Sequence, residues 1–167
     1  MNSTTWFGLA VAALAAGSLT TAAAAERCPH LSLLADASRL TDFEGAGNAQ
    51  FHATLGGEAL QCVVKDHVVH TRLKFKVTAD LKSGAKPDTR KVPYFVAVMQ
   101  GSQVLAKEVY SVDIPFSGRA RKVSVEERVN RVDIPLAQGK AAGDYQVMIG
   151  FQLTREQVDY NRQTGER

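Results

Sequence analysis

Four basic side chains occupy every second position of one short stretch of the chain. In residues 70–76, H-T-R-L-K-F-K, these are His70, Arg72, Lys74 and Lys76. Successive side chains of a β-strand point to opposite faces, so the four would share one face at intervals of about 6.6 Å. A row of this kind attracts anionic lipid headgroups, glycans or acidic proteins. The spacing therefore predicts a surface for an anionic partner.

The same row has a simpler interpretation as the solvated face of a strand. Lysine side chains on an edge strand keep it from pairing with other chains, and no ligand is needed to explain them. No aromatic residue shares this face, so the stacking platform of single-stranded nucleic-acid binders is missing. Further basic residues follow along the chain at Lys82, Lys86, Arg90 and Lys91. We expect the partner to be an envelope protein or another anionic envelope component, and not nucleic acid.

Histidine and cysteine side chains form a second candidate site. Cys28, His30, Cys62, His67 and His70 are ligand types that suit zinc or copper. Their spacing matches no compact metal motif. On one regular strand His67 and His70 would face opposite sides, so both could ligate only across a bulge. A metal-binding protein therefore remains the alternative hypothesis, with His30, His67 and His70 as its ligands.

The two cysteines, Cys28 and Cys62, are the only ones in the chain. In an oxidising compartment, a lone pair within one domain is most simply a disulfide. Closing a loop of about 35 residues would stabilise the fold by roughly 3–4 kcal/mol. Such a bridge would remove both thiolates from a metal site, so we expect no cofactor.

Motifs of the common enzyme classes are missing from the chain. There is no G-x-S-x-G, no H-E-x-x-H, no P-loop and no dinucleotide-binding glycine pattern. We therefore expect a protein that binds other molecules without catalysis and name no catalytic residue.

The elements that would carry these residues are strands. Polar and apolar residues alternate with a period of two in residues 69–81 and 145–153, as in half-buried antiparallel strands. Residues 92–99, V-P-Y-F-V-A-V-M, are almost wholly apolar, as in a central strand buried on both sides. Glycine-rich turn signals separate these runs, including the pair at residues 56–57. We predict an all-β sandwich of seven or eight strands, immunoglobulin-like or fibronectin-III-like, over a lipocalin-type barrel.

Two local signals refine this prediction. The stretch G-D-Y-Q-V, residues 143–147, resembles the tyrosine corner of immunoglobulin-like sandwiches. Residues 154–162 predict a short C-terminal helix, because Thr154 and Gln157 have the spacing of a capping box.

A repeated motif, V-x-x-V-D-I-P, occurs in residues 109–116 and 129–136. In both copies the apolar residues slip by one position after the first valine. Such a slip predicts a β-bulge or a strand that crosses between sheets. Pro115 and Pro135 should then end their strands, because proline cannot donate to a β-ladder.

The ends of the chain predict export. The first 25 residues contain no charged side chain, and an apolar run precedes A-A-A-A-E, with small residues at the expected cleavage position. We therefore expect a signal peptide over residues 1–25, a sandwich domain over 26–162 and a disordered tail over 163–167. The first residues lack Lys and Arg, so an uncleaved anchor or a cytoplasmic start is the alternative. After cleavage the protein should be soluble in the periplasm and not transmembrane.

Several segments resemble envelope proteins and lipoproteins of alphaproteobacteria that carry a domain of unknown function. These are C-P-H-L-S-L-L-A-D-A-S-R-L-T-D-F, the L-Q-C around Cys62, V-P-Y-F-V-A-V-M with V-L-A-K-E-V-Y-S-V-D-I-P-F, and G-D-Y-Q-V-M-I-G-F-Q-L-T-R-E-Q-V-D-Y-N-R. The resemblance implies a Gram-negative envelope location and an extracytoplasmic β-domain, but no activity. Cys28 follows Ala-Glu-Arg, which is not a lipobox, so a lipid anchor there is not expected. Together these observations predict a non-catalytic binding or scaffolding module of the cell envelope.

Overall fold

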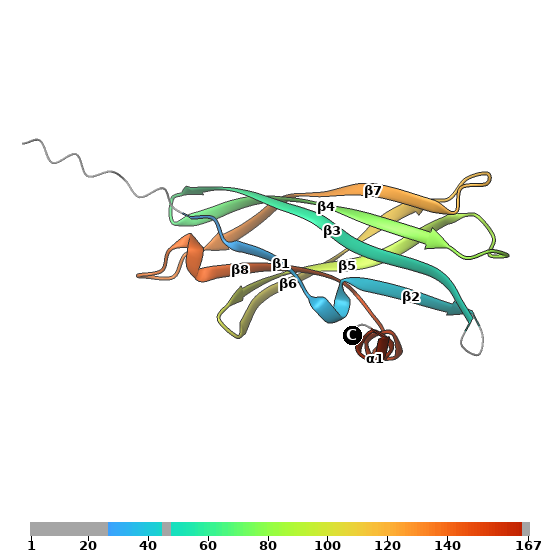
Figure 1. The fold of residues 1–167 in the computed structure, drawn as a ribbon. Coiled ribbons are helices and arrows are strands. Elements are labelled where there is room, and N and C mark those ends of the chain that lie inside the picture. Colours follow the sequence, from blue (N-terminus) through green and yellow to red (C-terminus); the bar gives the residue numbers. More distant parts are fainter. Residues whose placement is uncertain (1–26, 45–47, 165–167) are drawn as a thin grey trace, which may run out of the picture.

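A computed structural model describes residues 27–44 and 48–164 (Figure 1). The predicted signal peptide, residues 1–25, lies outside the described residues. Residues 165–167 of the predicted disordered tail also lie outside them. The first two residues of that segment, Gln163 and Thr164, are helical, so the C-terminal helix is longer than predicted.

Eight strands make up most of the domain. They are β1 (His30–Leu33), β2 (Arg39–Glu44), β3 (Asn48–Lys65), β4 (Val68–Leu81), β5 (Thr89–Gln100), β6 (Gln103–Pro115), β7 (Lys122–Pro135) and β8 (Tyr145–Phe151). Two short 3-10 helices, η1 (Ala35–Ala37) and η2 (Ala142–Asp144), precede β2 and β8. The helix α1 (Arg155–Thr164) follows β8.

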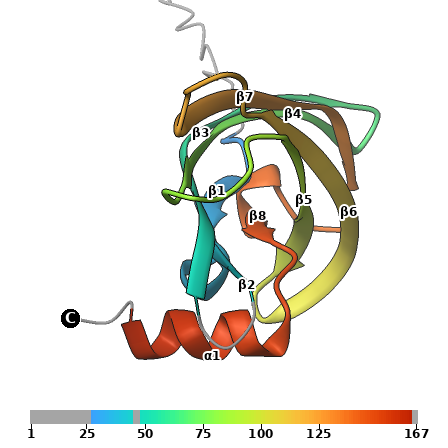
Figure 2. The same cartoon turned by 90° about the vertical axis from the view of Figure 1, so that its right-hand side faces the viewer.

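The strands form a sandwich of two four-stranded sheets, which confirms the predicted fold class. The first sheet has the order β1-β8-β5-β6 and the second has the order β2-β3-β4-β7 (Figures 1 and 2). The connections β4–β5, β6–β7 and β7–β8 each cross from one sheet to the other. Crossings of this kind are typical of immunoglobulin-like sandwiches. Here the margin of the first sheet beside β8 is occupied by β1, which pairs with β8 in parallel.

The predicted disulfide between Cys28 and Cys62 is present, with Cα atoms 5.6 Å apart. Cys28 directly precedes β1 in the first sheet, and Cys62 lies in β3 of the second sheet. The bond therefore joins the two sheets along one side of the sandwich. It also holds the start of the described chain against the body of the domain.

The sandwich core is built from alternate residues of the facing strands. Along β4, Leu73, Phe75 and Val77 are buried, while every intervening residue from Arg72 to Lys76 is exposed. The strand β5 is different, because residues 94–98 are all buried. Its inner side chains join the main core, and its outer side chains pack beneath the η1 helix. Both observations confirm the predicted strand types.

The repeated V-x-x-V-D-I-P motif has two different structures. In β7 the register with β4 shifts between Val129 and Val132, which confirms the predicted bulge. In β6 the pairing with β5 is regular from Val109 to Val112, so the prediction of a bulge or a sheet crossing there was wrong. Val109 breaks the apolar phase because it lies on the outer face and is 56% exposed. Both strands end at their proline, as predicted.

The glycine pair at residues 56–57 does not form a turn. It lies within β3, where the register with β4 shifts between Gly56 and Ala59. Gly57 adopts φ +62°, a conformation that favours glycine. The pair therefore makes a bulge and not the predicted break in the strand.

The tyrosine and the helix cap behave as the sequence predicts. The Tyr145 hydroxyl is buried and accepts a hydrogen bond from the Ala137 amide at 2.9 Å, as in a tyrosine corner. At the start of α1, the Gln157 amide donates to the Thr154 hydroxyl at 3.3 Å. The Gln157 side chain accepts from the Thr154 amide at 3.0 Å, which completes the capping box.

Candidate binding surface

The predicted basic row lies on the outer face of the second sheet. Arg72, Lys74 and Lys76 are exposed, and His70 is half-buried at one end of the row. The strand that carries them, β4, pairs with β3 on one side and β7 on the other. These lysines therefore do not protect an edge strand, and the simpler interpretation offered above was wrong on this point. Because both neighbours already satisfy the β4 ladder, edge protection cannot explain the row.

The ion pairs of this face leave the row unneutralised. Among the described residues, no carboxylate lies within 4.0 Å of the charged groups of Arg72, Lys74 or Lys76. Opposite Lys76, β7 places Glu126, but this carboxylate is paired with Arg128 on its own strand. The three side chains are exposed, so the row is accessible to an anion of another molecule.

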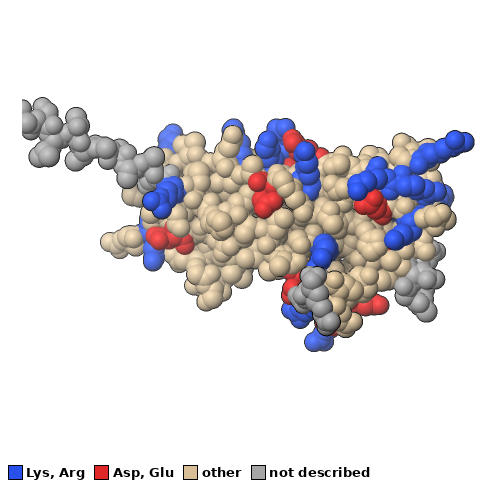
Figure 3. Space-filling view, viewed as in Figure 1, with Lys and Arg blue, Asp and Glu red and all other residues tan. Residues whose placement is uncertain are grey.

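The neighbouring strand adds more positive charge than negative charge. On the exposed faces of β4 and β7, the basic side chains exceed the acidic ones by three: Arg72, Lys74, Lys76, Lys122, Arg128 and Arg131 against Asp80, Glu126 and Asp133. Figure 3 shows basic side chains along the upper margin, over β4 and β7, and at the right-hand end of the molecule. The face therefore presents a positive field that extends beyond one strand.

Two of the basic residues that follow in sequence do not extend the row. Arg90 and Lys91 lie on β5, which belongs to the first sheet. Arg90 is paired with Asp88 at 2.8 Å, and Lys91 lies 3.9 Å from Asp113. The chain crosses between sheets after β4, so proximity in sequence does not become proximity on the surface.

A groove of about 440 Å³ lies at the His70 end of the row. Its polar lining comes from three strands: Gln61 of β3, His70 and Arg72 of β4, and Asn130, Arg131 and Asp133 of β7. The β7 bulge places Asn130 and Arg131 across from the single residue Arg72. Grooves that bind small ligands typically have volumes of about 300–1,000 Å³. The bulge thus contributes two polar side chains where a regular strand would contribute one.

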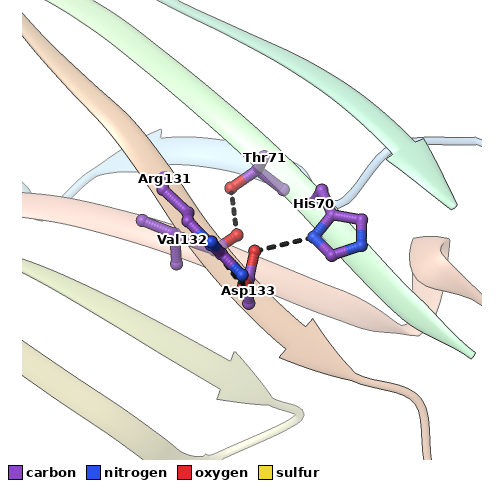
Figure 4. Close-up of polar contacts among 5 residues, drawn as sticks. All are labelled: His70, Thr71, Arg131, Val132 and Asp133. Carbon is purple, nitrogen blue, oxygen red and sulfur yellow. Dashed lines mark hydrogen bonds and ion pairs between the residues drawn. The ribbon is translucent and has the colours of Figure 1, made fainter. Parts of the chain in front are cut away.

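Hydrogen bonds fix one wall of this groove (Figure 4). The Asp133 carboxylate contacts His70 Nδ1 at 2.8 Å and Arg131 Nε at 2.6 Å. Beside them, the Thr71 hydroxyl donates to the Val132 carbonyl at 2.9 Å. The bonds from His70 and Thr71 tie the edge strand β7 to β4 just after the bulge.

The same contacts change the acid–base properties of the wall. Hydrogen bonds from Arg131 and then from His70 lower the pKa of Asp133 from its ordinary value. Asp133 in turn raises the pKa of Arg131. Asp133 therefore stays ionised at neutral pH and neutralises part of the charge of Arg131. Arg72 is left as the unpaired cation of the groove.

The predicted metal ligands are not brought together. Cys28 and Cys62 are bonded to each other and cannot ligate as thiolates. His30 lies on β1, whereas His67 occupies the β3–β4 turn with φ +60° and His70 contacts Asp133. Within residues 27–44 and 48–164, no three His, Cys, Asp or Glu side chains form a metal-binding group. No observation therefore favours the metal-binding alternative.

Several side chains of the groove were missed by sequence reasoning. Asn130, Arg131 and Asp133 lie far from the basic row in the chain and match no ligand-binding motif, and Gln61 lies on the strand that precedes the row. The phase slip of residues 129–136 did indicate a bulge, and a bulge next to a charged strand could have drawn attention to Arg131. Nothing in the sequence showed that β7 would pair with β4.

Comparison of the chain with family models, with curated proteins and with solved structures found no match. In the part of the chain that the structure describes, no helix has the length and apolar character needed to span a bilayer.

Proposed function

We propose that this protein is a non-catalytic binding module of the cell envelope whose second sheet holds an acidic glycan. The observation that carries the proposal is the run of three exposed, unneutralised cations, Arg72, Lys74 and Lys76, on a strand whose two neighbours leave it no edge to protect. Their side chains repeat at intervals of about 6.6 Å along the strand. This arrangement suits a linear ligand that carries anionic groups at regular intervals.

The groove beside the row favours a glycan over a simple lipid headgroup. Its amide side chains, Gln61 and Asn130, can both donate to and accept from sugar hydroxyls. Arg72 offers a planar guanidinium that suits a carboxylate or phosphate group. An acidic sugar unit in the groove would thus find donors for its hydroxyls and a cation for its charge.

The proposed location is the periplasm. The Cys28–Cys62 disulfide supports an oxidising compartment, because such bonds are rare where thiols are kept reduced. The uncharged first 25 residues support export in the same direction. Intact mass of protein isolated from a periplasmic fraction, before and after reduction with alkylation, tests both points. A chain that starts at Glu26 and is alkylated only after reduction is expected.

The binding test compares two triple variants with the same change of charge. One variant is R72E/K74E/K76E, which reverses the row. The control is K65E/K140E/R155E, whose three exposed side chains lie outside the row, Lys65 and Lys140 at one shared pocket and Arg155 on α1, and form no ion pair among the described residues. The probe is a polyuronate oligomer, with neutral dextran as the uncharged comparison, and affinity is measured by calorimetry at two salt concentrations.

We expect the wild type and the control to bind polyuronate, with affinity that falls as salt rises. The row variant should lose at least about tenfold in affinity, or about 1.4 kcal/mol. Asp133→Asn should bind more tightly than the wild type, because it releases Arg131 and His70 from their ion pairs. Equal losses in both triple variants would show non-specific charge attraction. Binding to anionic vesicles but not to polyuronate would assign the face to a membrane instead.

A further inference from the structure

The first sheet ends in a strand, β6, whose outer edge is unpaired and which exposes apolar side chains. β6 pairs only with β5, and residues 103–109 are all exposed. Val104, Leu105 and Val109 are 55%, 44% and 56% exposed, so among the described residues β6 carries three of the five exposed large apolar side chains. Figure 2 shows β6 at the margin of the molecule. A strand edge that exposes apolar side chains is a template for pairing with another chain, although β6 also carries Lys107 and a bulge between Val104 and Ala106.

Beside this edge, a cavity of about 300 Å³ opens between β6 and β7. Val96, Val98 and Ala106 form its apolar floor on the first sheet, and Arg131, Val132 and Asp133 line it from the second. Among the described residues, no hydrogen bond or ion pair joins β6 to β7. The described residues of β6 and β7 therefore face each other across the cavity without a polar contact between the two strands.

The mouth of the cavity carries an unneutralised negative charge. Glu108 is exposed and lies on the inner face of β6, opposite Val96. Its carboxylate accepts a hydrogen bond from the Tyr110 hydroxyl. No Lys, Arg or His of the described chain forms an ion pair with it. A partner that enters here would find a complementary position for one basic side chain.

We propose that the free edge of β6 binds an extended segment of another protein as an added strand. The backbone of that segment would pair with residues 103–110 of β6. Its inward side chains, apolar at every second position, would fill the cavity over Val96 and Val98, and one inward Lys or Arg would meet Glu108. Its outward side chains would lie beside Val104 and Val109. This surface does not include the basic row, although Arg131 and Asp133 line both the cavity and the groove, and it does not depend on the glycan proposal.

A designed peptide tests the assignment. The probe has nine residues, alternately valine and threonine, with the central valine replaced by lysine to meet Glu108. A second peptide has two of its residues replaced by proline, which cannot form the ladder. Amide hydrogen exchange of the full chain is measured with and without each peptide. Exchange along β4 serves as the check that every variant is folded.

Bound probe should slow exchange of the free-edge amides in residues 103–110 by about tenfold or more. Val109→Lys and Ala106→Trp should abolish this protection, the first by charging the edge and the second by filling the cavity. Val63→Lys, at an exposed valine on the other sheet, and R72E/K74E/K76E should keep it. The assignment is overturned if the probe protects no amide of β6. The same holds if the proline peptide protects β6 as strongly as the probe does, or if the probe protects β6 of the Ala106→Trp variant as strongly as β6 of the wild type. It is also overturned if protection arises without peptide and disappears on dilution, because the partner would then be a second copy.

Discussion

The two long sides of the sandwich are built differently. On the closed side, formed by β1, β2 and α1, a disulfide joins the sheets and the helix packs across their margin. The buried Asn161 of α1 donates to the carbonyls of Asp36 and Arg39 at 2.8 and 2.7 Å. On the open side, formed by β6 and β7, a cavity separates the sheets. One hydrogen bond spans the sheets near it, from the buried Tyr94 hydroxyl to Glu127 at 2.9 Å.

This difference separates the cross-linked part of the domain from the part that carries the proposed binding surfaces. The closed side holds the cross-link and the buried amide of Asn161, which constrain the chain. The open side places an unpaired edge, a bulge and unneutralised charges where another molecule can reach them. Binding surfaces are commonly carried on such less constrained regions of a fold, because ordered contacts elsewhere maintain the structure.

The largest expected loss of stability comes from removing the disulfide of the closed side. Replacing both cysteines, C28S/C62S, should lower the free energy of unfolding by roughly 3–4 kcal/mol, because the unfolded chain regains the entropy of a loop of about 35 residues. Urea denaturation of the oxidised wild type and the variant measures the difference. A loss in the free energy of unfolding below about 1 kcal/mol would mean that the contacts of α1 hold the closed side together without the disulfide.

The next effect concerns the helix. Asn161→Ala should destabilise the domain by roughly 2–3 kcal/mol, because two backbone carbonyls lose the same buried donor. Gln163→Ala, at an exposed position of the same helix, is the matched control and should change little. Thermal unfolding followed by circular dichroism compares them. Similar shifts in both variants would contradict a specific role for the buried amide.

A smaller effect is expected on the open side. Tyr94→Phe removes the hydroxyl that bonds Glu127 and should cost about 1 kcal/mol, because the half-buried carboxylate can take water in its place. Tyr110→Phe, whose partner Glu108 is exposed, should cost less. Chemical denaturation of both variants tests the comparison. If Tyr94→Phe destabilised the domain as much as Asn161→Ala, the open side would be as constrained as the closed one.

The smallest effect is a dependence on alkaline pH. Burial, and then a hydrogen bond to Glu108, raises the pKa of Tyr110 to about 12. Burial and Glu127 raise the pKa of Tyr94 further. Unfolded tyrosine titrates near pH 10, so the unfolded state loses these protons first as the pH rises. The stabilisation is complete below pH 10 and is lost as the pH rises through the folded pKa values.

Urea unfolding at about pH 9 and about pH 11 measures this loss in the wild type and in Y94F/Y110F. The double variant should lose less stability between the two pH values, because its open side has no phenol to ionise. Lysine titration affects both proteins alike and cancels in the comparison. An equal loss in the two proteins would remove the tyrosines as its cause.

Much of the fold could be predicted from local patterns. The period-two alternation of residues 69–81 placed Arg72, Lys74 and Lys76 on one exposed face, because adjacent side chains of a strand must point to opposite sides. The capping box of α1 and the hydrogen bond of Tyr145 also depend on residues close in sequence. The two copies of the repeated motif did not predict that their structures would differ. Val109 and Val129 begin the same V-x-x-V-D-I-P pattern, yet one is exposed on a regular strand and the other precedes a bulge.

The groove and the cavity could not be predicted in this way. His70 and Asp133 contact each other across 63 positions of sequence, and Tyr94 and Glu127 across 33. An alternating pattern shows which face a side chain occupies, but not which strand lies beside it.

By itself, the sequence determined the strands, their buried faces and the pair of cysteines available for a bridge, because these follow from local geometry and composition. The tertiary structure alone decided that β4 is an inner strand, that the β7 bulge lies beside Arg72 and that one edge of β6 is left unpaired. The reason is physical: strand order depends on how whole faces pack, and packing joins residues that the chain keeps far apart.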